Sequence, residues 1–296
     1  MPNLKSIKVR IKSIKSTQKI TQAMKLVAAS KVRKAQVRVL NSRPYSRKIV
    51  DFTLRTVKSI SPSDRQEFPL MSRREVKAVG IIIISSDRGL CGSYNTNNIK
   101  RAIKRIQELE SAGIAAKLIL IGNKANNFFK RAKVQVIDSF TQLPAAPTVE
   151  LANLIAQSAE KAFVTNTVDS VEIIGTDFIS MLRNEVYIKK FLPVGDLNQN
   201  SETPGNALET TSFMLFEPSL NDVLNSLLPL YLSNIIFHAL LEANCSELAS
   251  RMNAMSSATK NAKELIDLLT IVYNKARQAA ITQELTEIVG GAEALK

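Results

Sequence analysis

The spacing of apolar residues predicts a long helix at each end of the chain. Near the N-terminus, apolar residues recur three or four positions apart, at Leu4, Ile7, Ile11 and Ile14. This spacing is typical of a helix that buries one face. The same register continues to Val39 and predicts a helix from about residue 3 to the high fifties, ending at the SPSD segment of residues 61–64.

The C-terminal end has the same pattern. Positions three and four apart form a seam from Leu241 through Met255 and Ile266 to Ala280. A helix that begins near residues 217–219 and continues through Pro229 is roughly 100 Å long. Gly290 and Gly291 are natural helix terminators and are expected to end it. A helix of that length needs a partner, and the N-terminal helix is the simplest one.

The middle of the chain alternates between strand-like and helix-like patterns. Strand patterns cover 76–86, 116–122, 134–137, 170–180 and 185–194, and helical patterns cover 95–111, 123–131 and 148–165. Such alternation predicts a small sheet with crossover helices. The expected fold class is α/β: a small Rossmann-like α/β domain is inserted between long N- and C-terminal helices that form an antiparallel coiled coil.

These patterns divide the chain into four segments. They are an N-terminal helix at 1–59, the α/β domain at 74–194, a polar loop at 195–211 and a C-terminal helical segment at 212–296. Residues 223–241 carry no charged side chain over nineteen positions, close to the length of a membrane span. Polar residues and Pro229 interrupt this stretch, so we expect a partly buried helix and no membrane span.

The positive charge is concentrated in the first fifty residues. They contain 14 Lys or Arg and no Asp or Glu, whereas the rest of the chain has 26 basic and 26 acidic residues. Such a segment predicts an acidic partner, namely nucleic acid, an anionic membrane or an acidic protein surface. Residues 1–44 contain no aromatic residue and more Lys than Arg, which favours acidic protein groups over nucleic acid.

The seams of both helices become polar in the middle. Gln18, Thr21 and Lys25 occupy seam positions of the N-terminal helix, and Thr259 occupies one in the C-terminal helix. An apolar seam would stabilise a coiled coil more. The polar residues therefore indicate either control of register and orientation or a helix pair that is not a purely static rod.

The stretch IIIISSDRGLCGSYN, which starts at residue 81, is the strongest candidate for a phosphate-binding turn. It offers only Gly89 and Gly92, whereas nucleotide-binding turns need three spaced glycines or a loop closing with Gly-Lys-Ser/Thr. His238 is the only histidine, and Cys91 and Cys245 have none near in sequence. The sequence therefore predicts no catalytic triad, no metal site, no cofactor and no disulfide framework.

Three stretches resemble the gamma subunit of rotary F-type ATP synthases. They are IKSIKSTQKITQAMKLVAASKVRKAQ, SSDRGLCGSYN, and RMNAMSSATKNA followed by YNKARQAAITQELTEIVGGAEAL. The resemblance spans essentially the whole chain in order and includes FEPSL at 216–220. It implies that the long helices form a central rotor shaft inside a ring of alpha and beta subunits. The α/β domain is then a foot on the membrane c-ring and the epsilon subunit, with delta as an optional further partner.

The resemblance also implies roles for particular residues. Shaft contacts with alpha and beta fall on Met24, Lys25, Arg251, Arg277, Gln278 and Thr282. Asp87, Arg88 and Cys91 belong to a turn near an acidic loop of beta, and Phe216 and Glu217 face the c-ring. Ser93, Tyr94, Leu248 and Met214 depart from the residues usual in this family.

Catalysis in this family belongs to beta, so the resemblance implies a torque transmitter without an active site. It implies a peripheral position on the cytoplasmic side of a bacterial inner membrane, or on the equivalent side of an organelle membrane. Two alternatives stay open: a basic coiled-coil adaptor that binds nucleic acid, and a nucleotide-dependent α/β enzyme. Co-purification with alpha and beta, salt-sensitive retention on DNA, and ligand binding by the isolated chain distinguish the three.

Overall fold

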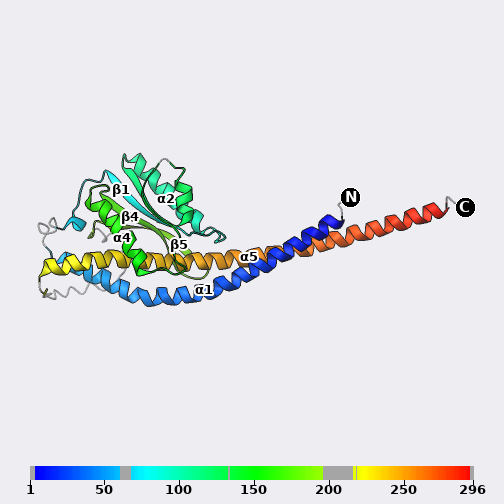
Figure 1. Ribbon diagram of the computed structural model, residues 1–296, viewed down its shortest axis with the longest axis horizontal. Helices are drawn as coiled ribbons and strands as arrows, with labels where there is room; N and C mark the ends of the chain where they lie inside the picture. The colour runs from blue at the N-terminus through cyan, green and yellow to red at the C-terminus, as the bar shows by residue number, and fades with distance from the viewer. Residues whose placement is uncertain (1–3, 61–67, 133, 196–215, 218, 294–296) are drawn as a thin grey trace. The chain divides into compact units, whose positions relative to one another are not determined.

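The computed structural model describes residues 4–60, 68–132, 134–195, 216–217 and 219–293. The chain forms two compact units. The helical unit consists of Met1–Ser30 and Arg251–Lys296, and the sheet unit consists of Lys31–Ser250. Two long helices contribute to both units, α1 (Leu4–Lys58) and α5 (Leu220–Glu293) (Figure 1).

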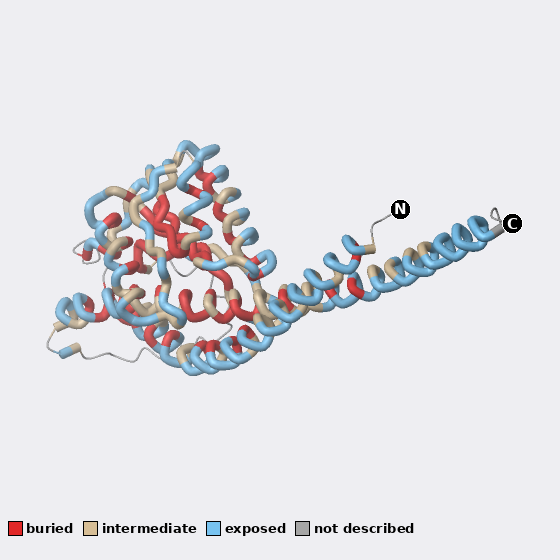
Figure 2. Tube along the Cα trace, turned by 45° about the vertical axis from the view of Figure 1, so that its right-hand side comes forward, coloured by how far each residue is buried: buried red, intermediate tan, exposed pale blue. Residues whose placement is uncertain are grey.

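The predicted seams are the buried faces of the two long helices. Every seam position from Leu4 to Val39 on α1, and from Leu241 to Ala280 on α5, is buried or half-buried. Figure 2 shows these positions as red and tan bands along both helices. Both helices continue through their internal prolines, Pro44 and Pro229. The two helices expected from apolar periodicity are therefore confirmed.

The predicted stop at Gly290 and Gly291 is wrong, because α5 continues through both glycines to Glu293. A glycine ends a helix when it adopts the left-handed conformation and its N–H caps the last carbonyls. Neither glycine has a positive φ. Each therefore stays in the helix, where glycine costs about 1 kcal/mol relative to alanine.

The long helices run antiparallel within the sheet unit. Residues 32–39 of α1 share a hydrophobic cluster with residues 241–249 of α5. Further along α1, Ile49 and Val57 share a second hydrophobic cluster with α5 residues between Leu224 and Ala243. In the helical unit, α1 and α5 also lie side by side in Figures 1 and 2. There Thr259 Oγ1 lies 2.9 Å from Thr21 Oγ1, so two of the polar seam residues pair with each other.

The sheet has five strands in the order β3-β2-β1-β4-β5. Strands β1 (Ala78–Ile84), β2 (Ala115–Ile121), β3 (Gln135–Phe140) and β4 (Ser170–Phe178) are parallel, and β5 (Asn184–Leu192) is antiparallel to β4. The helices between them are α2 (Tyr94–Ser111), α3 (Asn123–Phe129) and α4 (Val149–Val164), and a short 3₁₀ helix, η2 (Pro69–Met71), precedes β1. Each expected strand and helix is present; β3 extends three residues past its expected end.

Both faces of the sheet are covered, which explains the run of four isoleucines. Ile81 and Ile83 of β1 belong to the cluster that contains residues of α2 and α3. Ile82 and Ile84 belong to the cluster on the other face, with α4, α1 and α5. Successive side chains of a strand point to opposite faces. A strand buried on both faces therefore has an apolar residue at every position.

The uncharged stretch at 223–241 is a core helix of the sheet unit. By length and composition, α5 contains one segment apolar enough to cross a membrane. Its side chains instead pack against the sheet, and Leu224, Tyr231, Leu232 and Ile236 are each 0% exposed. The expectation of a partly buried helix is met. The predicted polar loop at 195–211 lies, except for Gly195, outside the described residues.

Candidate functional site

The turn after β1 is held in place by its own hydrogen bonds. The Asp87 carboxylate accepts from the backbone N–H of Asn123 at 2.8 Å and of Leu143 at 2.5 Å. The side chain of Asn95 accepts from the Ser86 N–H at 3.0 Å. Both oxygens of Asp87 are therefore used within the chain, where they fix the turn against the start of α3.

The cysteine of this turn faces inward. Cys91 is 2% exposed, and its Sγ lies 3.1 Å from Nδ2 of Asn95. Leu90 and Gly92 on either side have φ of 62° and 57°, which turn the chain so that the intervening side chain points in. The Cys91 thiol therefore points into the sheet unit, and the turn exposes other side chains. The outward side chains are Arg88 and Leu90, and Leu90 is 62% exposed.

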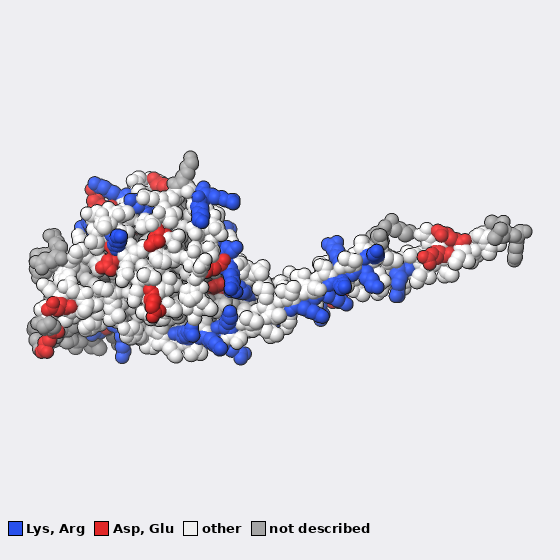
Figure 3. Space-filling model, in the orientation of Figure 1, with Lys and Arg blue, Asp and Glu red and all other residues white. Residues whose placement is uncertain are grey.

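The six expected shaft contacts all lie in the helical unit. Met24, Lys25 and Arg251 are half-buried, whereas Arg277, Gln278 and Thr282 are exposed. Thr282 Oγ1 donates to the Gln278 carbonyl at 3.0 Å, so these two residues share one face of α5. Figure 3 shows Lys and Arg side chains gathered along this unit, with acidic residues nearer the end of α5.

The two residues expected to face the c-ring lie directly before α5. Phe216 is half-buried and Glu217 is exposed. The helix that follows is capped by Ser219, whose Oγ accepts from the Asp222 N–H at 3.2 Å. This cap satisfies one of the free N–H groups at the helix start.

A polar cluster that the sequence did not predict connects α1, α5 and β4. The Arg43 guanidinium binds the Glu242 carboxylate, with Nε 3.0 Å from Oε1, and donates from Nη2 to the Phe178 carbonyl at 2.9 Å. The Phe178 N–H donates to Oε2 of Glu242 at 2.9 Å. His238 lies between Ser42 and Glu242, 3.2 Å and 3.4 Å away.

The fold therefore assembles a serine, a histidine and a carboxylate, although the sequence predicted no triad. Ser42 Oγ also lies 2.9 Å from the Val39 carbonyl, and Glu242 is held by Arg43 and by the Phe178 N–H. A nucleophile needs a base that is free to take its proton. Because these groups are engaged elsewhere, the cluster is suited to joining three elements rather than to hydrolysis.

The electrostatics of this cluster favour an uncharged histidine. Burial lowers the pKa of His238 below its usual value, and Arg43 and Lys189 lower it further, while Glu242 and Asp177 oppose this shift. Burial disfavours the charged imidazolium because it removes water from around the charge. A neutral His238 carries one ring proton, so it donates either from Nε2 to Glu242 or from Nδ1 to the Ser42 hydroxyl, whose own proton goes to the Val39 carbonyl.

Known proteins resemble this chain over its full length. A family model described as ATP synthase matches residues 3–295. The ATP synthase gamma chain of a Nostoc species is 43% identical, and that of Trichormus variabilis is 44% identical; each alignment covers 100% of both chains. The chain belongs to the ATP synthase gamma-chain family. The resemblance inferred from the three stretches of sequence is thus confirmed.

Solved structures agree with this family assignment. A chain of the Tetrahymena thermophila mitochondrial ATP synthase central stalk and c-ring structure matches with a TM-score of 0.60 and 28% identity, covering 81% of this chain and 99% of that one. A chain of the Euglena gracilis mitochondrial ATP synthase matches with a TM-score of 0.66 and 21% identity, covering 99% of this chain and 94% of that one. Because the second match is only 21% identical, it supports the fold alone.

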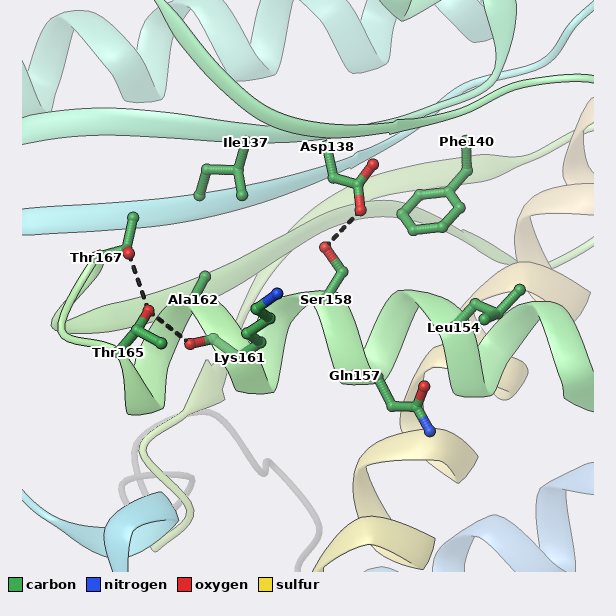
Figure 4. Close-up of a pocket in the computed structure, with 10 residues that line it drawn as sticks. All are labelled: Ile137, Asp138, Phe140, Leu154, Gln157, Ser158, Lys161, Ala162, Thr165 and Thr167. Atoms are coloured by element: carbon green, nitrogen blue, oxygen red, sulfur yellow. Dashed lines mark hydrogen bonds between the residues drawn. The ribbon is translucent and has the colours of Figure 1, made fainter.

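A cavity of about 430 Å³ lies between β3 and α4 in this gamma-chain fold (Figure 4). Asp138 and Ser158 meet across it at 2.8 Å, and Thr165 and Thr167 form a second contact at 3.0 Å. Within the described parts of the chain, no group of three or more His, Cys, Asp or Glu residues is placed to hold a metal ion. Asp138, Ser158, Thr165 and Thr167 are thus paired with one another within the cavity lining.

Glu172 and Glu242 were not predicted to form buried ion pairs, although the sequence marks both residues. Glu172 is an acid inside the apolar strand β4, and it binds Arg105 of α2. A charge within such a strand indicates a buried ion pair. Glu242 is the first charged residue after the uncharged stretch at 223–241, which also marked it. The partners on α2 and α1 could not be identified, because they lie 67 and 199 positions away in the sequence.

Proposed function

We propose that this chain is the central rotor stalk subunit of an F-type ATP synthase. In this role it transmits torque between the membrane c-ring and the catalytic beta subunits, and it catalyses no reaction itself. The observation that carries the proposal is the similarity to gamma chains over 100% of the chain. The two antiparallel helices and the covered sheet support the same role.

On this proposal, residues 1–59 and 212–296 supply the shaft and residues 74–194 supply the foot. The exposed Arg277, Gln278 and Thr282 contact alpha and beta, as do the half-buried Met24, Lys25 and Arg251. The turn that contains Asp87, Arg88 and Cys91 presents Arg88 and Leu90 to a beta loop. Phe216 and Glu217 face the c-ring, and epsilon and delta are further partners.

The charge distribution fits rotation in an acidic surrounding. Fourteen cations and no anion occupy residues 1–50. Attraction between a cationic shaft and acidic loops acts over a distance and at each angle of rotation, so no single position traps the shaft. The protein is then peripheral to the membrane, on the side where the beta subunits lie, which is the cytoplasmic side in a bacterium.

Reconstitution tests this proposal. The purified chain is mixed with alpha and beta subunits of a relative, and ATP hydrolysis is measured with and without it. We expect a stable complex whose ATPase activity depends on the chain, whereas the chain alone neither hydrolyses ATP nor binds it in equilibrium dialysis with Mg²⁺. Salt-sensitive retention on DNA without binding to alpha and beta would contradict the proposal and support the nucleic-acid adaptor.

A further inference from the structure

The polar cluster around Glu242 closes a ring of directed bonds among three elements. Arg43 of α1 binds Glu242 of α5 and the Phe178 carbonyl of β4. The Phe178 N–H in turn donates to the Glu242 carboxylate. Each element therefore bonds to both others within the sheet unit. The side chain of Glu242 is 4% exposed and that of Arg43 is 31% exposed.

The ring differs in kind from the apolar contacts around it. Phe178, Val39, Leu241 and Cys245 form a hydrophobic cluster between the same elements. Apolar burial depends on area and has no preferred direction, so small sliding of one element past another changes it little. Charge-assisted hydrogen bonds are short and directional. The planar guanidinium of arginine, a fork of fixed N–H donors, holds two contacts in fixed directions at once. Sliding of α1, α5 or β4 would break the ring.

We propose that the ring formed by Arg43, Glu242 and the backbone of Phe178 is the joint that transfers force between the α/β domain and both long helices. This inference rests on the proposed rotor function. A rotor whose foot is turned by the c-ring must pass shear from the sheet to the helix pair. The ring resists that shear, and Ser42 and His238 position the Glu242 carboxylate within it.

The test uses the assembled ATP synthase in membrane vesicles, with ATP hydrolysis and ATP-driven proton pumping measured on the same sample. Arg43→Lys keeps the charge and removes the fork, so one ammonium group replaces two fixed donors. Glu242→Gln keeps the shape of the side chain and removes its charge. The double variant Arg43→Met with Glu242→Met replaces the ring by apolar contacts and leaves no buried charge unpaired.

We expect all three variants to hydrolyse ATP as the wild type does when no gradient opposes rotation. Under an opposing proton gradient, the ratio of protons pumped to ATP hydrolysed should fall by roughly fivefold, because directed bonds have been lost. The matched control is Arg55→Lys, which alters an exposed pair with Asp51 on the same helix. It should keep the wild-type ratio.

The outcomes separate this inference from the proposed function. A wild-type ratio of protons pumped to ATP hydrolysed in the double variant would contradict the proposed joint, even if the single variants failed to assemble. Torsional stiffness measured on single complexes gives a second readout, and an unchanged stiffness would also contradict the joint. If the wild-type chain itself supports no pumping in an assembled complex, the proposed rotor function fails instead.

Discussion

Arg105 on α2 and Glu172 on β4 form a two-pronged ion pair across one face of the sheet, with Nε 2.8 Å from Oε2 and Nη2 2.6 Å from Oε1. The Glu172 side chain is 6% exposed and that of Arg105 is 27% exposed. Hydrogen bonding to Glu172 raises the pKa of Arg105, so the guanidinium stays charged. The pair connects a helix to the strand that leads to Phe178.

Removal of one partner of this pair should destabilise the protein more than removal of both. Arg105→Met leaves a buried carboxylate unpaired and should lower the free energy of unfolding by about 3 kcal/mol. Arg105→Met with Glu172→Met should recover most of that loss. The control is Arg55→Met, which breaks an exposed pair with Asp51 and should cost about 1 kcal/mol or less. Urea unfolding measures all three, and equal losses for the single and double variants would contradict the prediction.

Gly122→Ala should be strongly destabilising. Gly122 has a φ of +90°, and a Cβ there would lie 2.3 Å from the Ser85 carbonyl oxygen. Backbone strain and this overlap together should cost about 2–4 kcal/mol. Gly113→Ala is the matched control, because Gly113 has a φ of +73° with nothing within 4 Å of its Cβ position. It should cost about 1 kcal/mol in the same urea experiment; a similar loss at both positions would rule out the steric explanation.

His238 should make the protein less stable in acid. Burial lowers the pKa of His238 below that of the unfolded chain, which is about 6.5. Above about pH 6.5, His238 is neutral in both the folded and the unfolded protein. As the pH falls below this value, the unfolded protein binds the proton more readily than the folded protein does. The free energy of unfolding therefore decreases with falling pH.

His238→Gln removes this proton uptake, so its free energy of unfolding should depend less on pH below about 6.5 than that of the wild type. Urea titrations across this range compare the two proteins. The groups that face His238 are Ser42, Arg43, Glu242, Asp177 and Lys189, and all remain in the variant. Identical pH dependence in both proteins would show that His238 does not contribute.

Neither cysteine of the native chain should react rapidly with a maleimide. Cys91 is 2% exposed and Cys245 is 0% exposed. Burial also raises the pKa of Cys245 to about 12, so the reactive thiolate is scarce. Both should react in denaturant. Leu90→Cys places a thiol on the 62% exposed neighbour of Cys91, and mass spectrometry should find it labelled first; rapid labelling of Cys91 would contradict the inward orientation.

The exposed residues near the end of α5 should matter for turnover but not for folding. Arg277→Ala with Gln278→Leu removes a cation and an amide from the proposed contact with beta. Their loss should weaken that contact by about 2–4 kcal/mol where it excludes water. The variant should assemble, keep its helical content and lose most ATPase activity. Gln283→Ala, which removes a contact with Glu287 on the same helix, should keep it. Wild-type turnover in the double variant would show that these side chains are only solvated surface.

Apolar periodicity predicted most of the fold because it directly reflects which faces are buried. The seams on α1 and α5 were readable because a helix returns to the same face every three or four residues. The isoleucine run of β1 indicated burial on both faces. Gly290 was misread because a glycine ends a helix only if its backbone turns left-handed, and its own residue type leaves that choice open.

The sequence by itself determined the long helices, the covered sheet, the cationic N-terminal segment and the family. Tertiary structure alone decided that Cys91 faces inward and that Arg43, His238 and Glu242 meet. Arg43 and Glu242 lie 199 positions apart in the sequence. Local patterns encode which face of an element is buried, but the partner that an individual polar side chain meets depends on how distant elements pack.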